Sequence, residues 1–351
     1  MTPLAQIIAA RIAATGPITL AEYMSECLLH PQHGYYTTRD PLGAAGDFTT
    51  APEISQMFGE LLGLALAQSW LDQGSPSPFT LAELGPGRGT LMADVLRATR
   101  SVPGFHAGAQ VRLLEASPTL RAAQQARLQG ADVDWMAAIT DLPEQPLFLL
   151  ANEFFDALPI HQFHHDGAQW RERLVGLRDG ALGFGLSDPI CNVPDSAAFR
   201  APRPGQVVEV CPAAHPYLHS LGQRIRQHGG AALIVDYGSW GTSGDTFQAL
   251  RQHAFADPLA EPGLADLTAH VDFAALAAGA GLPCVYAEQG AFLIRLGIDA
   301  RAARLAAGLT GVALESHRAA HRRLTHRDEM GSVFKVLGLY RPGSPPPPGF
   351  A

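Results

Sequence analysis

The chain has 351 residues, of which 47% are hydrophobic and 17% are charged. This length is sufficient for about two domains, and the composition excludes a disordered or fibrous protein. The formal net charge of -8 argues against broad binding to nucleic acid, because such binding needs a basic surface.

The start of the chain predicts neither a secretory signal nor a membrane anchor. Its apolar run is broken by Arg11, and no stretch approaches the roughly 18 apolar residues of a membrane span. The four cysteines are scattered without a C-x-x-C pair, which argues against a zinc site and is typical of a reducing compartment. We therefore expect a cytoplasmic protein, and the arginine- and alanine-rich composition favours a bacterial source.

The N-terminal part is expected to be helical around one irregular segment. Residues 4–14 and 19–30 show the apolar spacing of amphipathic helices, and residues 53–72 predict another helix. Residues 30–55 lack a clear period, and a loop of this length is more often functional than not. We assign residues 1–75 to a helical cap with an active-site loop.

Strands and helices then alternate along the chain. We expect strands at residues 79–84, 110–116, 133–138 and 147–152, with helices at 89–100 and 117–129 between them. This alternation is typical of a parallel sheet with right-handed crossovers. The predicted fold is therefore α/β, with a doubly wound Rossmann-like sheet whose first part spans residues 76–159.

The pattern changes after Pro159. Two hairpin signals, Asp166-Gly167 and Asp179-Gly180, predict an antiparallel insertion. The remaining expected elements are a helix at 213–228, a strand at 231–238, an irregular region at 239–270, helices at 271–280 and 296–325, and a strand at 333–340. We assign residues 160–212 to an inserted substrate-side subdomain, 213–340 to the second part of the sheet domain and 341–351 to a flexible tail.

The most informative local motif is AELGPGRGT, residues 82–90, at a predicted strand–turn–helix junction. Gly85, Gly87 and Gly89 allow a sharp turn and close approach of a ligand, and the helix start offers free N–H groups. The third glycine falls one residue early for a nicotinamide dinucleotide fingerprint, and no G-K-[ST] follows for a P-loop. The glycines are also compatible with a tight turn that binds nothing.

The pattern E-x-G-x-G-x-G, which includes Glu83 and Pro86, resembles the first motif of S-adenosylmethionine (SAM) methyltransferases. That resemblance implies that Glu83 and the glycine turn face the methionine part of SAM, that Glu115 binds the ribose hydroxyls, and that Trp135 contacts the adenine. Glu115 also suits NAD or a solvated strand end, and Trp135 also suits core packing.

Further segments narrow the resemblance. They are GYY (34–36), GDFTTAPEISQMFGE (46–60), ELGPGRGT (83–90), ANEFFDALP (151–159), VDYG (235–238), DLTAHVDF (266–273) and MGSVFKVL (330–337). Together they resemble the MidA-like family of SAM-dependent methyltransferases over residues 16–340. The mitochondrial members of that family are complex I assembly factors that dimethylate an arginine on a core subunit. The resemblance thus implies SAM as cofactor and a protein substrate, and it is compatible with a homodimer.

Acidic residues provide the candidate catalytic groups. A guanidinium acceptor is cationic, and a nearby carboxylate can bind it bidentately and localise its charge. Asn152 and Glu153 follow a predicted strand at its carboxyl end, where an open α/β sheet forms its ligand crevice. We expect Glu153 or Asp156 to orient the acceptor, Asn152 to bind it or the amino-acid end of SAM, and Asp47 to close the site. Asp156 also suits a helix cap.

Two other groups of side chains have structural interpretations. Glu53 also suits the first turn of a helix, where an acid interacts favourably with the macrodipole. His161 and His165 lie on one face of a predicted strand and His164 lies on the other, so we expect no metal.

Three other functions compete with protein-arginine methylation. They are methylation of a small molecule, a non-catalytic SAM-binding assembly chaperone, and a nicotinamide oxidoreductase. An intact glycine motif and Glu115 count against the chaperone, because a protein without catalysis could lose both.

Overall fold

The computed structural model describes residues 1–38, 49–191, 193–194, 197–200, 202–241 and 244–350. The chain forms two compact units, each built from three segments. Unit 1 contains Met1–Phe48, Phe155–His215 and Ser239–Asp272, and unit 2 contains Thr49–Phe154, Pro216–Gly238 and Phe273–Ala351.

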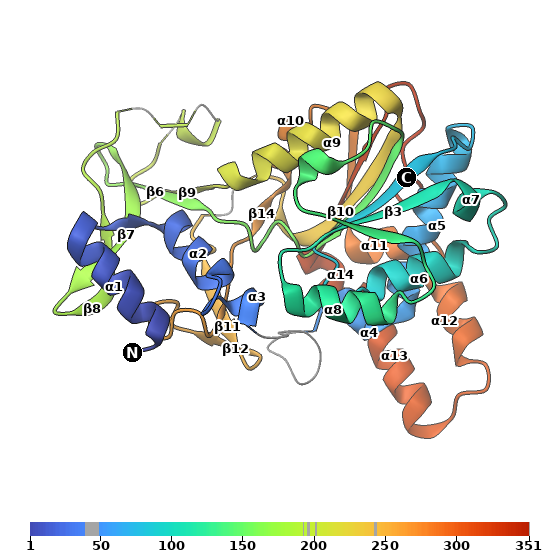
Figure 1. Ribbon diagram of the computed structural model, residues 1–351, viewed down its shortest axis with the longest axis horizontal. Helices are drawn as coiled ribbons and strands as arrows, with labels where there is room; N and C mark the ends of the chain where they lie inside the picture. Colours follow the sequence, from blue (N-terminus) through green and yellow to red (C-terminus); the bar gives the residue numbers. More distant parts are fainter. Residues whose placement is uncertain (39–48, 192, 195–196, 201, 242–243, 351) are drawn as a thin grey trace. The chain divides into compact units, whose positions relative to one another are not determined.

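Unit 2 contains the sheet that the strand–helix alternation predicts (Figure 1). Its strand order is β15-β16-β10-β5-β2-β3-β4. The strands are β2 (Phe79–Leu84), β3 (Ala109–Leu114), β4 (Val133–Met136), β5 (Leu147–Asn152), β10 (Gly230–Ser239), β15 (Cys284–Glu288) and β16 (Phe334–Tyr340). β4, β3, β2, β5 and β10 pair in parallel, whereas β16 is antiparallel to both β10 and β15. The predicted doubly wound α/β fold is confirmed.

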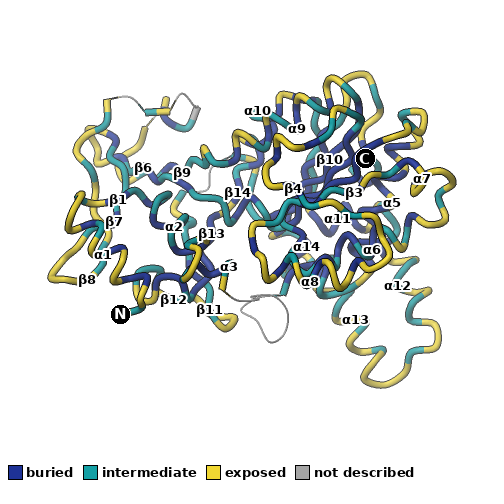
Figure 2. The backbone as a smooth tube through the Cα atoms, in the orientation of Figure 1, coloured by how far each residue is buried: buried dark blue, intermediate teal, exposed yellow. Residues whose placement is uncertain are grey.

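Helices flank this sheet. They are α4 (Ala51–Ile54), α5 (Gln56–Asp72), α6 (Thr90–Thr99), α7 (Phe105–Gly108), α8 (Pro118–Arg127), α9 (His215–His228), α10 (Phe273–Ala280), α11 (Gln289–Arg295), α12 (Ile298–Ala306), α13 (Gly311–Thr325) and α14 (Met330–Val333). Alternate strand residues such as Phe79 and Phe148 point to one face and pack edge-on, with ring centroids 5.4 Å apart. Figure 2 shows the strands of this unit as mostly buried. This packing fixes the carboxyl ends of β2, β3 and β5, where the candidate residues lie.

Some expected helices are divided. The helix expected at 53–72 breaks at Ser55, which is extended (φ -162°) and caps α5 by accepting a hydrogen bond from the Met57 N–H. The helix expected at 296–325 is two helices, because Gly308 in the connection and Gly311 at the start of α13 adopt positive φ. The expected flexible tail also differs, since the Phe350 ring packs on Phe292 with centroids 4.9 Å apart.

In its described residues, unit 1 combines three α-helices with antiparallel strands. Its helices are α1 (Pro3–Thr15), α2 (Leu20–Leu29) and α3 (Tyr35–Thr38). One sheet has the order β1-β7-β6-β9, with β8 beside β7, and contains β1 (Ile18–Thr19), β6 (His161–His165), β7 (Trp170–Arg178), β8 (Ala181–Leu186) and β9 (Val207–Val210). The region 239–270, expected to be irregular, instead contributes β11 (Gln248–Arg251), β12 (Ala254–Ala256) and β13 (Asp266–Thr268) in the order β12-β11-β13.

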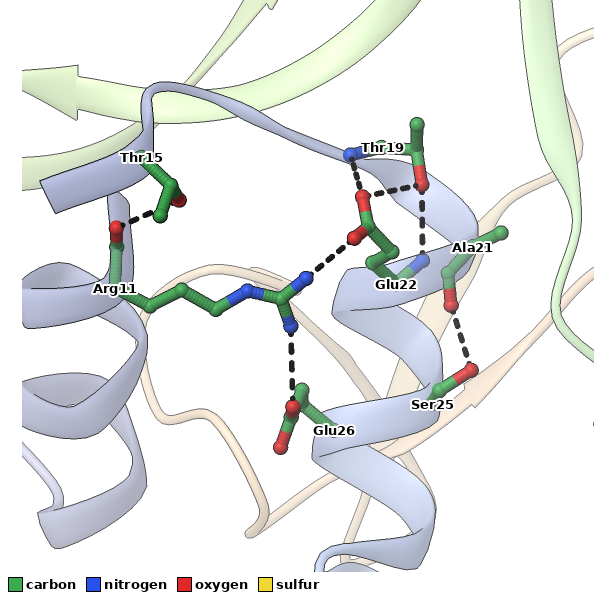
Figure 3. A network of polar contacts seen from close by, with 7 residues as sticks. All are labelled: Arg11, Thr15, Thr19, Ala21, Glu22, Ser25 and Glu26. Carbon is green, nitrogen blue, oxygen red and sulfur yellow. Dashed lines mark hydrogen bonds and ion pairs between the residues drawn. The ribbon is translucent and has the colours of Figure 1, made fainter. Parts of the chain in front are cut away.

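Polar contacts join α1 to α2 (Figure 3). Thr19 and Glu22 form a capping box at the start of α2. Arg11 of α1 binds Glu22 and also donates to Glu26 Oε1 at 3.2 Å. The Glu22 pKa lies below its usual value because its carboxylate accepts the Thr19 N–H, and Arg11 adds to this effect. Among the described residues, no helix is long and apolar enough to cross a bilayer.

Candidate functional site

The glycine motif forms a tight turn between β2 and α6. Gly85, Gly87 and Gly89 adopt φ of 61°, 54° and 78°, a region that residues with a Cβ rarely occupy. A Cβ on Gly85 would lie 2.9 Å from the ring of Phe154, so this position is also sterically restricted. The Gly89 N–H closes the turn on the carbonyl of Pro86 at 2.7 Å. The turn therefore leads directly into the N-terminus of α6, where backbone N–H groups are available.

Glu83, the acid of this motif, is a buried titratable group. Only 2% of its surface is exposed, and its carboxylate accepts the backbone N–H of Met92 in α6. Burial raises the Glu83 pKa to about 8. Within the described chain, its Oε2 atom is buried without a hydrogen-bond partner. A cationic ligand group could donate a hydrogen bond to this oxygen. It would also favour the charged form of the Glu83 carboxylate.

Glu115 lies just after β3 and is held by the residues that follow it. Its Oε1 atom accepts the Ser117 N–H at 2.8 Å, and its Oε2 atom accepts the side-chain amide of Gln124 at 3.0 Å. Burial raises the Glu115 pKa above its usual value. The expected ribose-binding acid is therefore fixed in orientation beside the glycine turn.

Gln124 is the residue at this site that sequence reasoning missed. It is fully buried, and its amide also donates to the main-chain oxygen of Gly87 at 2.7 Å, while its side-chain oxygen accepts the indole N–H of Trp135 at 2.7 Å. One side chain thus joins the glycine turn, Glu115 and Trp135. A signal was present in the sequence, because Gln124 occupies the same helical face as Leu120 and Leu128, where an apolar residue is expected.

The carboxyl end of β5 positions two of the expected catalytic residues. Glu153 adopts a left-handed backbone conformation (φ 51°), which is uncommon for a residue with a side chain. Its Oε1 atom accepts the Asn152 side-chain amide at 3.0 Å and the Ala51 N–H at 3.3 Å. Asn152 Oδ1 is buried and, among the described residues, has no hydrogen-bond partner. The pair therefore presents a carboxylate and a carbonyl oxygen at the end of the strand.

Glu53 lies in the first turn of α4 and also interacts with two residues of the glycine motif. Thr90, the first residue of α6, donates its hydroxyl to Glu53 Oε1, and Arg88 Nη1 lies 3.9 Å from Glu53 Oε2. Glu53 thus connects the segment before α5 to the glycine turn.

Two of the expected residues do not belong to the described part of unit 2. Asp156 belongs to unit 1, whereas Glu153 belongs to unit 2. Within unit 1, Asp156 lies near Tyr36, whose phenol donates to Asp266 Oδ1 at 2.8 Å. Burial raises the Tyr36 pKa well above its usual value, and the charges of Asp266 and Asp156 raise it further. Asp47 lies outside the described residues.

One of the histidines of β6 has an acidic partner. His161 interacts through Nδ1 with Glu172, and the described residues contain no group of three or more side chains that could hold a metal ion.

Comparison with known proteins identifies the family. Residues 61–284 match the model of a family described as S-adenosyl-L-methionine-dependent methyltransferases. The chain belongs to this family. It is 39% identical to a Drosophila melanogaster homologue of the mitochondrial protein arginine methyltransferase NDUFAF7, over 96% of this chain and 84% of that protein. The Danio rerio protein of the same name is 42% identical over 84% of this chain and 76% of its own length.

A solved structure with bound S-adenosyl-homocysteine has the same fold. It is that of a Burkholderia thailandensis protein that is 29% identical, with a TM-score of 0.82 over 96% of this chain and 92% of that one. The predicted resemblance to the MidA-like family and the predicted cofactor, SAM, are confirmed. The expectation of a cytoplasmic protein is wrong, because the curated relatives of this methyltransferase are mitochondrial by name.

The residues of unit 2 fit the cofactor. The buried oxygens of Glu83 and Asn152 are suited to the ammonium group of the methionine part. Glu115 offers acceptors for two hydroxyl groups, and the glycine turn leaves room for close approach of a ligand.

Proposed function

We propose that this methyltransferase transfers a methyl group from SAM to a guanidinium nitrogen of a protein arginine, and that Glu153 orients the acceptor. The observation that carries this proposal is the left-handed backbone of Glu153. Such a conformation costs about 1–3 kcal/mol and persists where surrounding structure enforces it, commonly at active sites.

The contacts of Glu153 support its role. Two N–H groups direct its carboxylate, and it follows β5 at the edge of the sheet where α/β enzymes bind ligands. When bound, SAM supplies an electrophilic methyl group. A carboxylate that binds two guanidinium N–H groups localises positive charge and leaves the remaining nitrogen more nucleophilic.

The residues that we assign to SAM also lie in unit 2. We assign the methionine part of SAM to Glu83, Asn152 and the turn formed by Gly85, Pro86, Gly87 and Gly89. Glu115 would bind the ribose hydroxyls, and the half-buried Trp135 would contact the adenine. Arginine as the acceptor is supported by the names of the relatives, which are protein arginine methyltransferases.

Finer assignments rest on the family resemblance. They are a core subunit of respiratory complex I as the acceptor protein, a homodimeric enzyme, residues 160–212 as a substrate-side subdomain, and roles for Asp156 and Asp47 in orienting the acceptor and closing the site.

The proposal is tested with labelled SAM and arginine-containing peptides from complex I core subunits. We expect methyl transfer to arginine, detected by mass spectrometry, and no transfer to matched peptides with lysine in place of arginine. Transfer to a small molecule alone would contradict the proposal, as would SAM binding without transfer to any arginine peptide.

A further inference from the structure

Positive charge is concentrated in one part of this acidic chain. Residues 295–329, which include α12 and α13, contain seven arginines and four acids, although the whole chain has a net charge of -8. The arginines are Arg295, Arg301, Arg304, Arg318, Arg322, Arg323 and Arg327, and the acids are Asp299, Glu315, Asp328 and Glu329, of which the last two pair with Arg327 and Arg322. The methyl-transfer site does not use this segment.

The helical hairpin formed by α12 and α13 is firmly anchored in unit 2. Ile298 at the start of α12 is fully buried, and Arg301 donates to both carboxylate oxygens of Glu60 at 2.7 and 2.9 Å. His317 of α13 contacts the carbonyl of Ala302 in α12 at 2.9 Å. The hairpin is therefore held as an ordered element, with its connection away from the sheet of this unit (Figure 1).

The connection between the two helices is uncharged. Residues 305–314 read LAAGLTGVAL, and the Val312 side chain is 78% exposed. Figure 2 shows the end of the hairpin as largely exposed. Leu305, Leu309 and Leu314 of this stretch are half-buried, so the end of the hairpin is apolar and in part accessible.

Exposed cations flank this stretch on both helices. Arg304 lies just before it, and on α13 the exposed Glu315 is followed by Arg318 and Arg323. In the part of the chain that the structure describes, none of these three arginines has an ion pair. Arg318 also borders a shallow groove between the helices whose wall includes Ala306 and Leu314. Long arginine side chains can follow an apolar surface while their charged ends remain in water or among phosphates.

We propose that the α12–α13 hairpin is a docking surface for a lipid bilayer that carries anionic headgroups. Residues 305–314 would enter the interfacial region, with Arg304, Arg318 and Arg323 among the phosphates. An apolar end with cations behind it is the arrangement that interfacial membrane binding requires. Nucleic acid or an acidic protein would instead favour cations at the exposed end itself.

The test is co-sedimentation of the full chain with vesicles. Phosphatidylcholine vesicles are compared with vesicles that also contain phosphatidylglycerol, without SAM or acceptor, so the result is independent of the proposed methyl transfer. We expect binding only to the anionic vesicles, weakened by salt. Each arginine near an anionic surface contributes about a fivefold gain in partitioning, so a triple Arg304→Ala, Arg318→Ala, Arg323→Ala variant should bind about 100-fold more weakly.

A matched triple variant tests whether the position of the arginines matters or only the net charge of the protein. Arg100→Ala, Arg178→Ala, Arg203→Ala removes three exposed arginines elsewhere and should bind like the wild type. Val312→Trp should show a blue shift of tryptophan emission on anionic vesicles beyond that of the wild type. Three outcomes would each overturn the proposal. The first is an equal loss of binding in both triple variants, and the second is no binding of the wild type to anionic vesicles at low salt. The third is binding to RNA or polyglutamate in place of vesicles.

Discussion

The indole N–H of Trp135 donates to the side-chain oxygen of Gln124 at 2.7 Å. The amide of the same glutamine donates to Glu115 and to the main chain of Gly87. Glu115 and Trp135 are expected to contact the ribose and the adenine of SAM. Both are oriented by Gln124, which is buried from solvent and, on our assignment, does not contact the cofactor. Gln124 is a positioning residue.

Gln124→Met should weaken binding of S-adenosyl-homocysteine by about 10- to 100-fold. It leaves the Trp135 N–H and the carbonyl of Gly87 without their partner, and each unsatisfied buried group costs about 1–3 kcal/mol. Calorimetric titration measures the affinity, and tryptophan emission reports the environment of Trp135. Gln125→Met, on the exposed side of the same helix, is the control. Equal affinity in the two variants would remove Gln124 from the site.

Gly87→Val should abolish binding of SAM. The backbone at this position has φ 54°, which a β-branched residue disfavours, and the new side chain would occupy the space beside the turn. Gly130→Val provides the comparison, because Gly130 also has positive φ (84°) but no atoms near its absent Cβ. We expect both variants to remain folded by circular dichroism and only Gly87→Val to lose binding. Retained affinity in Gly87→Val would refute the assignment of the turn.

Glu153→Gln should retain SAM binding and lose at least about 100-fold in turnover. Glutamine keeps an oxygen that can accept from Asn152 and Ala51, but it cannot pair with a cationic guanidinium. The exposed Glu144→Gln variant should keep full activity. A Glu153 variant that turns over at the wild-type rate would show that another group orients the acceptor.

Glu153→Gly isolates the backbone contribution. Glycine adopts φ 51° without penalty, so thermal unfolding should occur at the same or a higher temperature although activity is lost. A marked loss of stability would mean that the side chain of Glu153 serves mainly to hold the fold together.

Glu83 should make stability and ligand binding depend on pH. Its pKa of about 8 in the folded protein exceeds its ordinary value of 4.5, so the folded state binds the proton more tightly than the unfolded chain. The Glu83 contribution to the free energy of unfolding therefore falls as pH rises from about 4.5 to 8. Glu83→Gln should show a shallower decline over this range, measured by denaturant unfolding, whereas the exposed Glu315→Gln should not.

The same group predicts proton release on ligand binding. An ammonium group that contacts Glu83 favours the carboxylate, so binding of S-adenosyl-homocysteine at pH 7 should release a proton. Titrations in phosphate and Tris would then give different apparent enthalpies for the wild type and equal ones for Glu83→Gln. Buffer-independent enthalpies in the wild type would contradict this role.

Local sequence patterns predict the sheet well and the helix ends poorly. The run Phe79–Leu84 followed by glycines leads to β2, the turn and α6, because apolar strands and glycine conformations are local properties. The break at Ser55 depends on a cap and an extended backbone that propensity does not reveal. Gln124 was missed for another reason, since its importance comes from Gly87, Glu115 and Trp135, which only the fold brings together.

The division of the sheet along the chain bears on how the protein folds. β2, β3 and β4 are neighbours in sequence, but the next pairing, β5 with β10, joins Leu147 to Gly230 across the long stretch Phe155–His215 of unit 1. β10 must then pair with β16, which joins Ala231 to Tyr340. Pairings over such separations carry a high loop-closure cost and form slowly. The topology therefore predicts that the glycine turn and Glu115 assemble early, and that Glu153 acquires its partner Val235 later, when the sheet closes.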